Sequence, residues 1–471
     1  MHTKPPQPVD PRTRALLEAP IAPTLLRLGA PNVLVMVAQA AVGLIETYFI
    51  GRLGTDALGG VALVFPLVML MQMMSAGAVG GGISSAIARA LGARRKDDAD
   101  ALALHAVLIS VAFGLVFTLA AWLGGEALYR RMGGSGAALQ VALTYSGWVF
   151  SGAVLVWLFN ALASVVRGTG NMAVPAAVTC IGTLVLVPLS PALIFGFGPI
   201  PALGVAGGAI ALLLFYAAGT LWLAWYLAAG RSVVAPRLRG FRLRKPLLAD
   251  ILRVGAAGAV STVATNVSIA IATALAGAYG AAGIAGYGTA SRLEYLLVPL
   301  VFGLGGPLVA MVGTCIGAGQ RERALRATWI GAAIAVALTE AIGLLAAAFP
   351  GPWMRLFTDD PAVIAAGSTY LRIVGPFYGF FALGLLLYFA SQGAGRLKWP
   401  VIGNIVRLVV AGAGGWLAAR AGLGLPGIFA AQAVALMVYG VLNAAAVAGG
   451  AWFGPLRWPR RRPIPLLQEQ A

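Results

Sequence analysis

Long apolar stretches separated by short polar segments make up most of this chain. Each stretch is close to the roughly 20 residues that a helix needs to cross the hydrocarbon layer of a bilayer. The sequence therefore predicts an all-α polytopic membrane protein with twelve transmembrane helices. Their approximate bounds are 27–50, 57–86, 101–124, 137–165, 174–197, 203–229, 251–279, 284–314, 325–349, 364–391, 399–421 and 424–452.

The overall composition agrees with a membrane location. Of the 471 residues, 60% are hydrophobic and only 10% are charged, whereas about 25% of the residues in an ordinary soluble domain are charged. The segment before the first span is polar and proline-rich and lacks the compact apolar core of a signal peptide, so we expect none to be removed. The two cysteines, Cys180 and Cys315, are too few for a disulfide framework or a cysteine metal site and are expected to be packing residues.

Basic residues are distributed unevenly between alternate loops. The chain has 33 Lys and Arg against 15 acids, and most of the basic residues fall on one side of the predicted membrane. If the amino terminus is inside, the outer loops keep only Arg52, Arg130, Arg131, Arg355 and Arg420. This asymmetry predicts that both termini are cytoplasmic. The positive charge then orients the protein and contacts anionic lipid headgroups, and we expect no nucleic-acid partner.

Several landmarks occur twice, in the same order and at a nearly constant offset. "RGTGNMAVP" (Arg167 to Pro175) returns as "QGAGRLKWP" (Gln392 to Pro400), and "LGARRKDDA" (Leu91 to Ala99) returns as "IGAGQRERA" (Ile316 to Ala324). Two six-helix halves with an even number of spans each are parallel repeats. The expected divisions are a cytoplasmic tail, a first lobe, a cytoplasmic linker, a second lobe and a basic cytoplasmic tail, at 1–26, 27–230, 231–250, 251–453 and 454–471.

Two similar lobes around a central cleft are the geometry that alternating access requires, although channels and membrane enzymes also contain parallel repeats. The chain has no GxxxxGK[ST] loop for nucleotide phosphates and no HExxH motif. Only two histidines are present, and no cluster has the spacing of metal ligands. We therefore expect a transporter that is not driven by ATP, not an enzyme, and without a metal site or a cofactor.

Glu46 is the strongest candidate for ion coupling. It lies within the first apolar span, where an ionisable side chain costs at least about 2.5 kcal/mol to insert. Gln39 lies two turns earlier on the same predicted face. A carboxyl there can hold and release a proton, or offer its oxygens to a sodium ion. The alternative is that Glu46 lies near the outer helix end and only bonds a neighbour.

Other polar and aromatic positions within spans are candidates for substrate binding. Glu294 could attract a cationic substrate or neutralise a buried arginine, and its spacing from Arg292 does not let the two pair on one helix. Glu340 is expected to be structural. Interhelical hydrogen bonds and packing are the alternative explanation for the whole set. The candidate residues are Asn160, Asn266, Tyr287, Arg292, Glu294, Tyr378 and Arg407.

Five segments together resemble the multidrug and toxic compound extrusion (MATE) transporters, and in particular their bacterial DNA-damage-inducible-F-like branch. They are "GLIETYFIGRLGTDALGGVAL", "VVRGTGNMAVP", "PALIFGFGPIPALGVAGGAIA", "LVPLVFGLGGPLVAMVGTCIGAGQRERA" and "WPVIGNIVRLVV". The resemblance implies a V-shaped bundle of twelve helices. It also places the family's first-span acidic residue at Glu46. Where many relatives have an asparagine and an aspartate in the fifth span, this chain has Leu186 and Ser190, which favours protons over sodium.

The expected function is therefore secondary active efflux of organic, cationic or amphipathic compounds in exchange for H⁺, or less favourably Na⁺. The expected location is a bacterial inner membrane. The protein is expected to be a monomer, and its expected partners are small organic substrates and membrane lipids. The alternatives are a flippase for lipid-linked precursors of the same superfamily, for which Arg292, Arg372 and Arg407 would supply positive charge, or a membrane-embedded enzyme or channel.

Overall fold

The computed structural model describes residues 10–199, 201–237, 239 and 241–452. The predicted carboxy-terminal tail (454–471) lies outside the described residues. Within them the chain is a series of helices joined by short connections. A short helix α1 (Pro11–Glu18) lies in the predicted amino-terminal tail, and α10 begins at Lys245, inside the predicted linker.

The first half of the chain forms one helical bundle. Its helices are α2 (Ile21–Gly51), α3 (Thr55–Gln72), the π-helix η1 (Met73–Val79), α4 (Gly80–Gly92), α5 (Lys96–Arg131), α6 (Gly136–Ser151), α7 (Ala153–Gly168), α8 (Ala173–Phe195) and α9 (Val205–Ala228). A buried apolar core contains residues of α3, α4, α5, α6, α7 and α9. We call this bundle the first lobe.

The second half forms a second bundle, which we call the second lobe. Its helices are α10 (Lys245–Gly277), α11 (Gly280–Gly317), α12 (Arg321–Ala348), α13 (Pro350–Arg355), α14 (Pro361–Val374), the 3₁₀-helix η2 (Gly375–Phe377), α15 (Tyr378–Gly393), α16 (Lys398–Arg420) and α17 (Gly424–Ala448).

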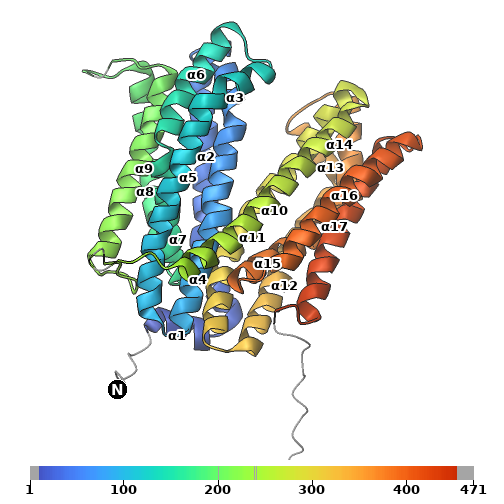
Figure 1. Ribbon diagram of the computed structural model, residues 1–471. Helices are drawn as coiled ribbons and strands as arrows, with labels where there is room; N and C mark the ends of the chain where they lie inside the picture. The colour runs from blue at the N-terminus through green and yellow to red at the C-terminus, as the bar shows by residue number, and fades with distance from the viewer. Residues whose placement is uncertain (1–9, 200, 238, 240, 453–471) are drawn as a thin grey trace, which may run out of the picture.

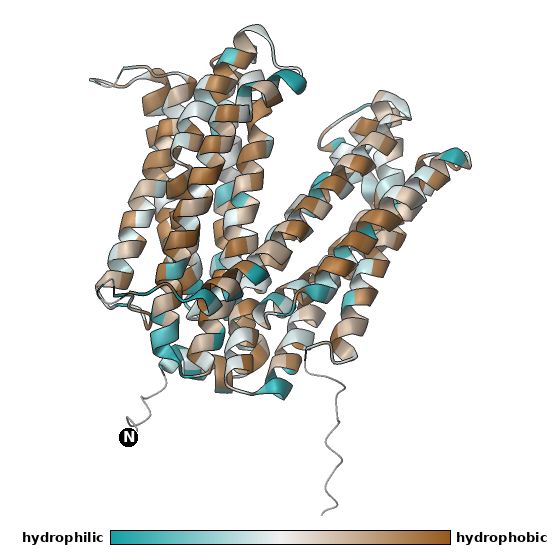
Figure 2. Cartoon of the chain, viewed as in Figure 1, coloured by the Kyte–Doolittle hydropathy of each residue, from teal (hydrophilic) through white to brown (hydrophobic). Residues whose placement is uncertain are grey.

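Eleven spans among the described residues are long and apolar enough to cross a membrane. The pair α6 and α7, bent by 46° at their junction, adds a twelfth when it is counted as one span. This agrees with the twelve transmembrane helices expected from hydropathy. Hydrophobic residues cover most of the helix length, while hydrophilic residues gather towards helix ends and connections (Figure 2). The protein is therefore a multi-pass membrane protein.

The two lobes meet at one end and diverge at the other, which gives the molecule a V shape (Figure 1). The first lobe contacts the second chiefly through η1 and α4, which pack against α10, α11 and α15, and through α2, which packs against α11. The end where the lobes meet carries the turn Arg94 to Lys96, the connection between α9 and α10, and the turn before α12. We call it the closed side, and it is the side that carries most of the basic loop residues.

The repeated glycine motifs have the same local structure in both lobes. Gly170 and Gly395 occupy equivalent places in the two copies, and both have a positive φ, of 82° and 68°. A left-handed residue after the last helical turn is a common helix ending, and glycine adopts it without strain. The helices α8 and α16 then begin within a few residues. Each motif is therefore a tight helix-to-helix connection.

Glycines also let α4 and α11 cross with their backbones in contact. A side chain at Gly92 would meet the carbonyl of Thr314, and a side chain at Gly317 would meet the carbonyl of Arg89. Gly92 and Gly317 are equivalent positions of the repeat, and so are Arg89 and Thr314. The crossing is therefore reciprocal, and it lies where the two repeats meet.

Candidate functional site

Glu46 lies on α2 and faces the interior of the first lobe. Its Oε1 is buried and has no hydrogen-bond partner among the described residues. Tyr145 of α6 and Tyr216 of α9 are close enough to interact with it electrostatically. A carboxyl oxygen removed from water without a partner is costly when it is ionised. Binding of a proton or another cation would relieve that cost.

A hydrogen-bonded group extends from Tyr216 towards the other lobe. Gln72, the last residue of α3, donates a hydrogen bond to the Tyr216 hydroxyl. Asn160 of α7 donates to Gln72 Oε1 at 3.1 Å and to Ser75 Oγ at 2.8 Å. Ser75 belongs to η1. We call Tyr216, Gln72, Asn160 and Ser75 the first-lobe network.

Two other polar side chains of α2, Gln39 and Thr47, do not join this network. Gln39 is exposed, and none of the contacts described for Glu46 involves it. The hydroxyl of Thr47 donates to the carbonyl of Gly43 in its own helix at 2.7 Å. On α8, which packs against α2, Leu186 and Ser190 are both buried. That face of α8 therefore offers Glu46 no second carboxylate.

The second lobe holds a separate group around Glu294 of α11. The hydroxyl of Tyr370 on α14 donates a hydrogen bond to Glu294 Oε1. Arg407 of α16 interacts electrostatically with the same carboxylate. Its guanidinium also lies over the rings of Phe381 and Tyr439, 5.5 and 5.6 Å from their centroids. The carboxylate is thus partly neutralised by a cation within the same lobe.

Buried aromatic rings surround this group. Tyr287 lies edge-on to Tyr370, with their centroids 5.3 Å apart, and stacks near Phe429. Tyr378 is fully buried and interacts electrostatically with Glu294. Four predicted residues, Tyr287, Glu294, Tyr378 and Arg407, therefore lie together. We call them the second-lobe group.

The other polar candidates have individual partners. Asn266 is exposed and donates to the carbonyl of Thr262 in its own helix at 2.9 Å. Arg292 is exposed and lies over the Phe357 ring, 5.4 Å from its centroid. Neither belongs to the second-lobe group.

Glu340 has a contact that accounts for its presence within a span. Its Oε2 accepts the backbone N–H of Gly379 at 2.7 Å, where α15 begins after η2. The first amides of a helix have no intrahelical partner. Glu340 therefore completes the hydrogen bonding of a broken span, which supports the structural role expected for it.

Sequence reasoning did not single out Gln72, Ser75, Tyr145 or Tyr216. Gln72 and Ser75 are polar residues three apart in an otherwise apolar span, and that signal could have drawn attention to them. The tyrosines could not be selected in this way, because their importance depends on which helix each one faces. Among the described residues, no group of three or more His, Cys, Asp or Glu side chains could hold a metal ion.

Comparisons with known proteins agree with this architecture. The family model MatE matches residues 31–192 and 258–417, well over half of the chain. A protein of Shewanella oneidensis named FAD transporter is 26% identical, covering 84% of this chain and 87% of its own. The multidrug export protein MepA of Staphylococcus aureus is 22% identical, covering 83% of this chain and 86% of its own.

A solved structure described as the outward-facing conformation of a multidrug resistance MATE family transporter of the MOP superfamily has a TM-score of 0.84. It is 26% identical and covers 93% of this chain and 97% of its own. The fold and the comparisons thus define a multi-pass membrane transporter and not an enzyme. The chain belongs to the MATE family of multidrug efflux transporters. Its assignment to the DNA-damage-inducible-F-like branch stays a prediction.

Proposed function

We propose that the protein exports organic, cationic or amphipathic compounds across a bacterial inner membrane in exchange for protons, with both termini in the cytoplasm. The observation that carries this proposal is the buried, unpartnered oxygen of Glu46 beside the first-lobe network. The V shape, closed on the side that carries most of the basic loops, supports alternating access with the outer side open.

The set of residues around Glu46 favours a proton over sodium. Hard cations take several oxygen ligands, whereas Glu46 is accompanied by two tyrosines, and α8 carries Leu186 and Ser190 in place of further ligands. A proton needs only the one carboxylate. No cofactor is proposed besides this coupling ion.

The exchange cycle follows from the two states of Glu46. Protonation from the outside neutralises the carboxyl, the helices around it repack, and the substrate loses its place in the open cleft. Release of the proton to the cytoplasm resets the protein. Proton and substrate must favour different conformations, because a ligand with equal affinity for both shifts nothing.

The second-lobe group is proposed to form part of the substrate site. Aromatic faces attract organic cations, and Glu294 supplies negative charge beside Tyr287 and Tyr378. Because one relative is named as an FAD transporter, FAD belongs in the substrate panel as an anionic alternative. We propose that the protein acts as a monomer surrounded by lipid and without a nucleic-acid partner.

The decisive experiment uses purified protein in proteoliposomes that contain a pH-sensitive dye. Wild type should move protons when an organic cation such as ethidium is added, and sodium should not replace the proton gradient. Glu46→Gln should still bind ethidium but should not exchange it for protons. Glu340→Gln is the matched control, because it removes an intramembrane carboxylate but keeps an oxygen for the Gly379 amide, and it should exchange normally.

Other outcomes would reject this proposal. Normal exchange by Glu46→Gln would make Glu46 structural and direct attention to Glu294. If wild type moves neither ion nor drug, the protein is not an antiporter of these compounds, and a flippase assay with lipid-linked precursors becomes the next experiment.

A further inference from the structure

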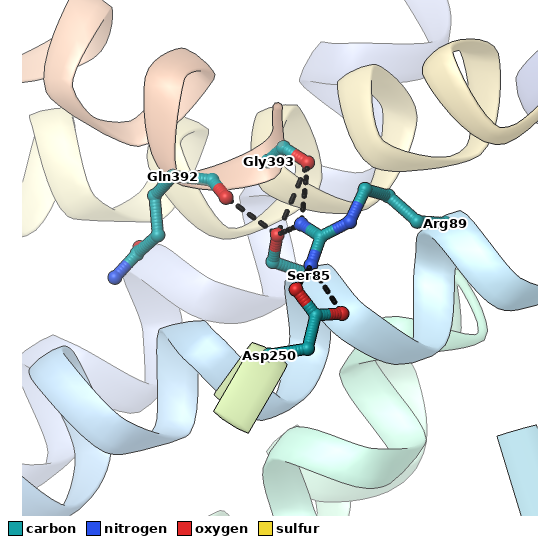
Figure 3. A network of polar contacts seen from close by, with 5 residues as sticks. All are labelled: Ser85, Arg89, Asp250, Gln392 and Gly393. Atoms are coloured by element: carbon teal, nitrogen blue, oxygen red, sulfur yellow. Dashed lines mark hydrogen bonds and ion pairs between the residues drawn. The ribbon is translucent and has the colours of Figure 1, made fainter. Parts of the chain in front are cut away.

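The end of α15 is held by the first lobe at three points on the closed side. The hydroxyl of Ser85 on α4 donates to the carbonyl of Gln392 at 2.5 Å, and the Gly393 carbonyl lies 3.0 Å from the same hydroxyl. Arg89 adds a bond to the Gly393 carbonyl at 3.2 Å. Figure 3 shows these contacts converging from both lobes. They fix the backbone of α15 against α4.

The side chain of Gln392 makes a fourth contact, with a different element. Its Nε2 donates to the carbonyl of Gly77 at 3.2 Å. Gln392 is completely buried, and a side chain at Gly81 would overlap its amide group. The first lobe thus leaves room for this one glutamine of the second lobe and offers it an acceptor.

Gly77 lies in η1, which also belongs to the first-lobe network through Ser75. Ser75, two residues earlier, accepts the bond from Asn160, and Gln72 directly precedes the π-helix. π-helices are rare, and single turns of them inside α-helices are frequent at functional sites. One short segment therefore has hydrogen bonds both to the network beside Glu46 and to the second lobe.

The equivalent position of the first repeat does not make such a contact. Gln392 corresponds to Arg167, whose Nη2 donates to Ser164 of its own helix and lobe at 2.9 Å. The position of the second repeat that is equivalent to Glu46 is an alanine, Ala272, which has no carboxyl group. Among the described residues, neither end of the bridge from Gln392 to Glu46 is therefore repeated at its equivalent position in the other lobe.

We propose that Gln392 is a positioning residue that couples the protonation state of Glu46 to the closing of the lobes, through the π-helix η1. The inference rests on the proposed antiport function and extends it to a residue of the opposite lobe. Neutralising Glu46 rearranges Tyr216, Gln72 and Asn160, and η1 shifts with Ser75. The Gly77 carbonyl then leaves Gln392, and the interface on the closed side is released.

The test separates coupling from transport itself. In proteoliposomes, substrate exchange without a proton gradient measures whether the lobes still alternate, and uphill accumulation driven by a proton gradient measures coupling. Gln392→Met keeps the length of the side chain and removes the amide. We expect near wild-type exchange and a loss of about tenfold in gradient-driven accumulation, which is the effect of one hydrogen bond on an equilibrium constant.

Two further variants make the result specific. Gln72→Met breaks the same path on the other side of η1 and should show the same split, so it carries the test if Gln392→Met does not fold. Gln432→Met removes an intramembrane glutamine of α17 and should stay fully coupled.

Two results would overturn the inference. In the first, accumulation and exchange fall together in both path variants, which is the behaviour of a structural residue. In the second, both variants stay coupled as wild type does. If wild type itself shows no proton-driven accumulation, the proposed function has failed and this inference fails with it. A coupled wild type with coupled variants rejects the inference alone.

Discussion

The ion pair between Arg89 and Asp250 should set how firmly the closed side stays shut. Nη2 of Arg89 lies 2.8 Å from both carboxylate oxygens of Asp250, and the pair joins α4 of the first lobe to α10 of the second (Figure 3). Four of the other ion pairs described for this chain join residues three or four positions apart, and the fifth joins Asp98 of α5 to Arg244 in the connection before α10. Breaking this pair should therefore favour the conformation in which the closed side opens.

The expected size of the effect follows from the exposure of the two side chains. Arg89 is 13% exposed and Asp250 is 43% exposed. Exposed pairs contribute at most about 1 kcal/mol, and breaking a fully buried pair costs about 3–5 kcal/mol. An intermediate value of about 2 kcal/mol corresponds to about a 30-fold change in the ratio of the two conformations. Asp250→Asn should produce that shift.

Pulsed electron paramagnetic resonance can measure the shift directly. Spin labels at the exposed positions Asp97 and Lys398, in a background without Cys180 and Cys315, report the distance between the lobes on the closed side. Asp250→Asn should raise the ratio of the longer-distance to the shorter-distance population by about 30-fold relative to wild type.

A charge reversal and an unrelated pair complete this experiment. Arg89→Asp combined with Asp250→Arg should recover much of the short distance, because the attraction is restored in the opposite sense. Glu126→Gln breaks the exposed pair of Glu126 with Arg130, within α5, and should change nothing. Unchanged distances in Asp250→Asn would refute the idea that this pair holds the lobes together.

Three further changes have expected outcomes. Glu340→Ala leaves a buried backbone amide at the start of α15 without an acceptor and should lower the free energy of unfolding by about 1–3 kcal/mol. The measurement is a lower melting temperature, followed with a thiol-reactive dye that reports exposure of the cysteines. Gly92→Val places a side chain against the backbone of α11 and should cost about 1–3 kcal/mol in the same assay, whereas Gly43→Val, in open space, should cost less. Tyr370→Phe removes the donor to Glu294 and should weaken ethidium binding severalfold, measured by fluorescence, without changing the proton dependence of exchange.

The sequence alone was sufficient for the architecture. Hydropathy located the spans because a bilayer imposes a length of about 20 apolar residues on each helix. The doubled motifs indicated two equivalent halves because matching turns need the same glycines, as Gly170 and Gly395 show. Glu46 stood out because carboxylates within spans are rare and costly.

The partners of the candidate residues could not be predicted in the same way. Gln72 and Tyr216 are 144 positions apart in the chain, and only the tertiary packing of the first lobe brings them together. Helical spacing placed Gln39 on the face of Glu46, but a helix of 31 residues such as α2 passes through different surroundings along its length. The π-helix was also beyond prediction, because its altered hydrogen bonding leaves no distinct mark in an apolar sequence.

The reciprocal crossing of α4 and α11 can act as a pivot between the two lobes. With Gly92 and Gly317 in backbone contact, the lobes can tilt about this point with little sliding. The 38 residues of α11, at 1.5 Å per residue, reach about 55 Å from this point. Each degree of tilt therefore moves the far end of the helix by about 1 Å. Because the 13 residues of α4 place η1 about 20 Å from this crossing, a displacement of about 1 Å at η1, on the scale of one hydrogen bond breaking, moves the opposite mouth by about 3 Å.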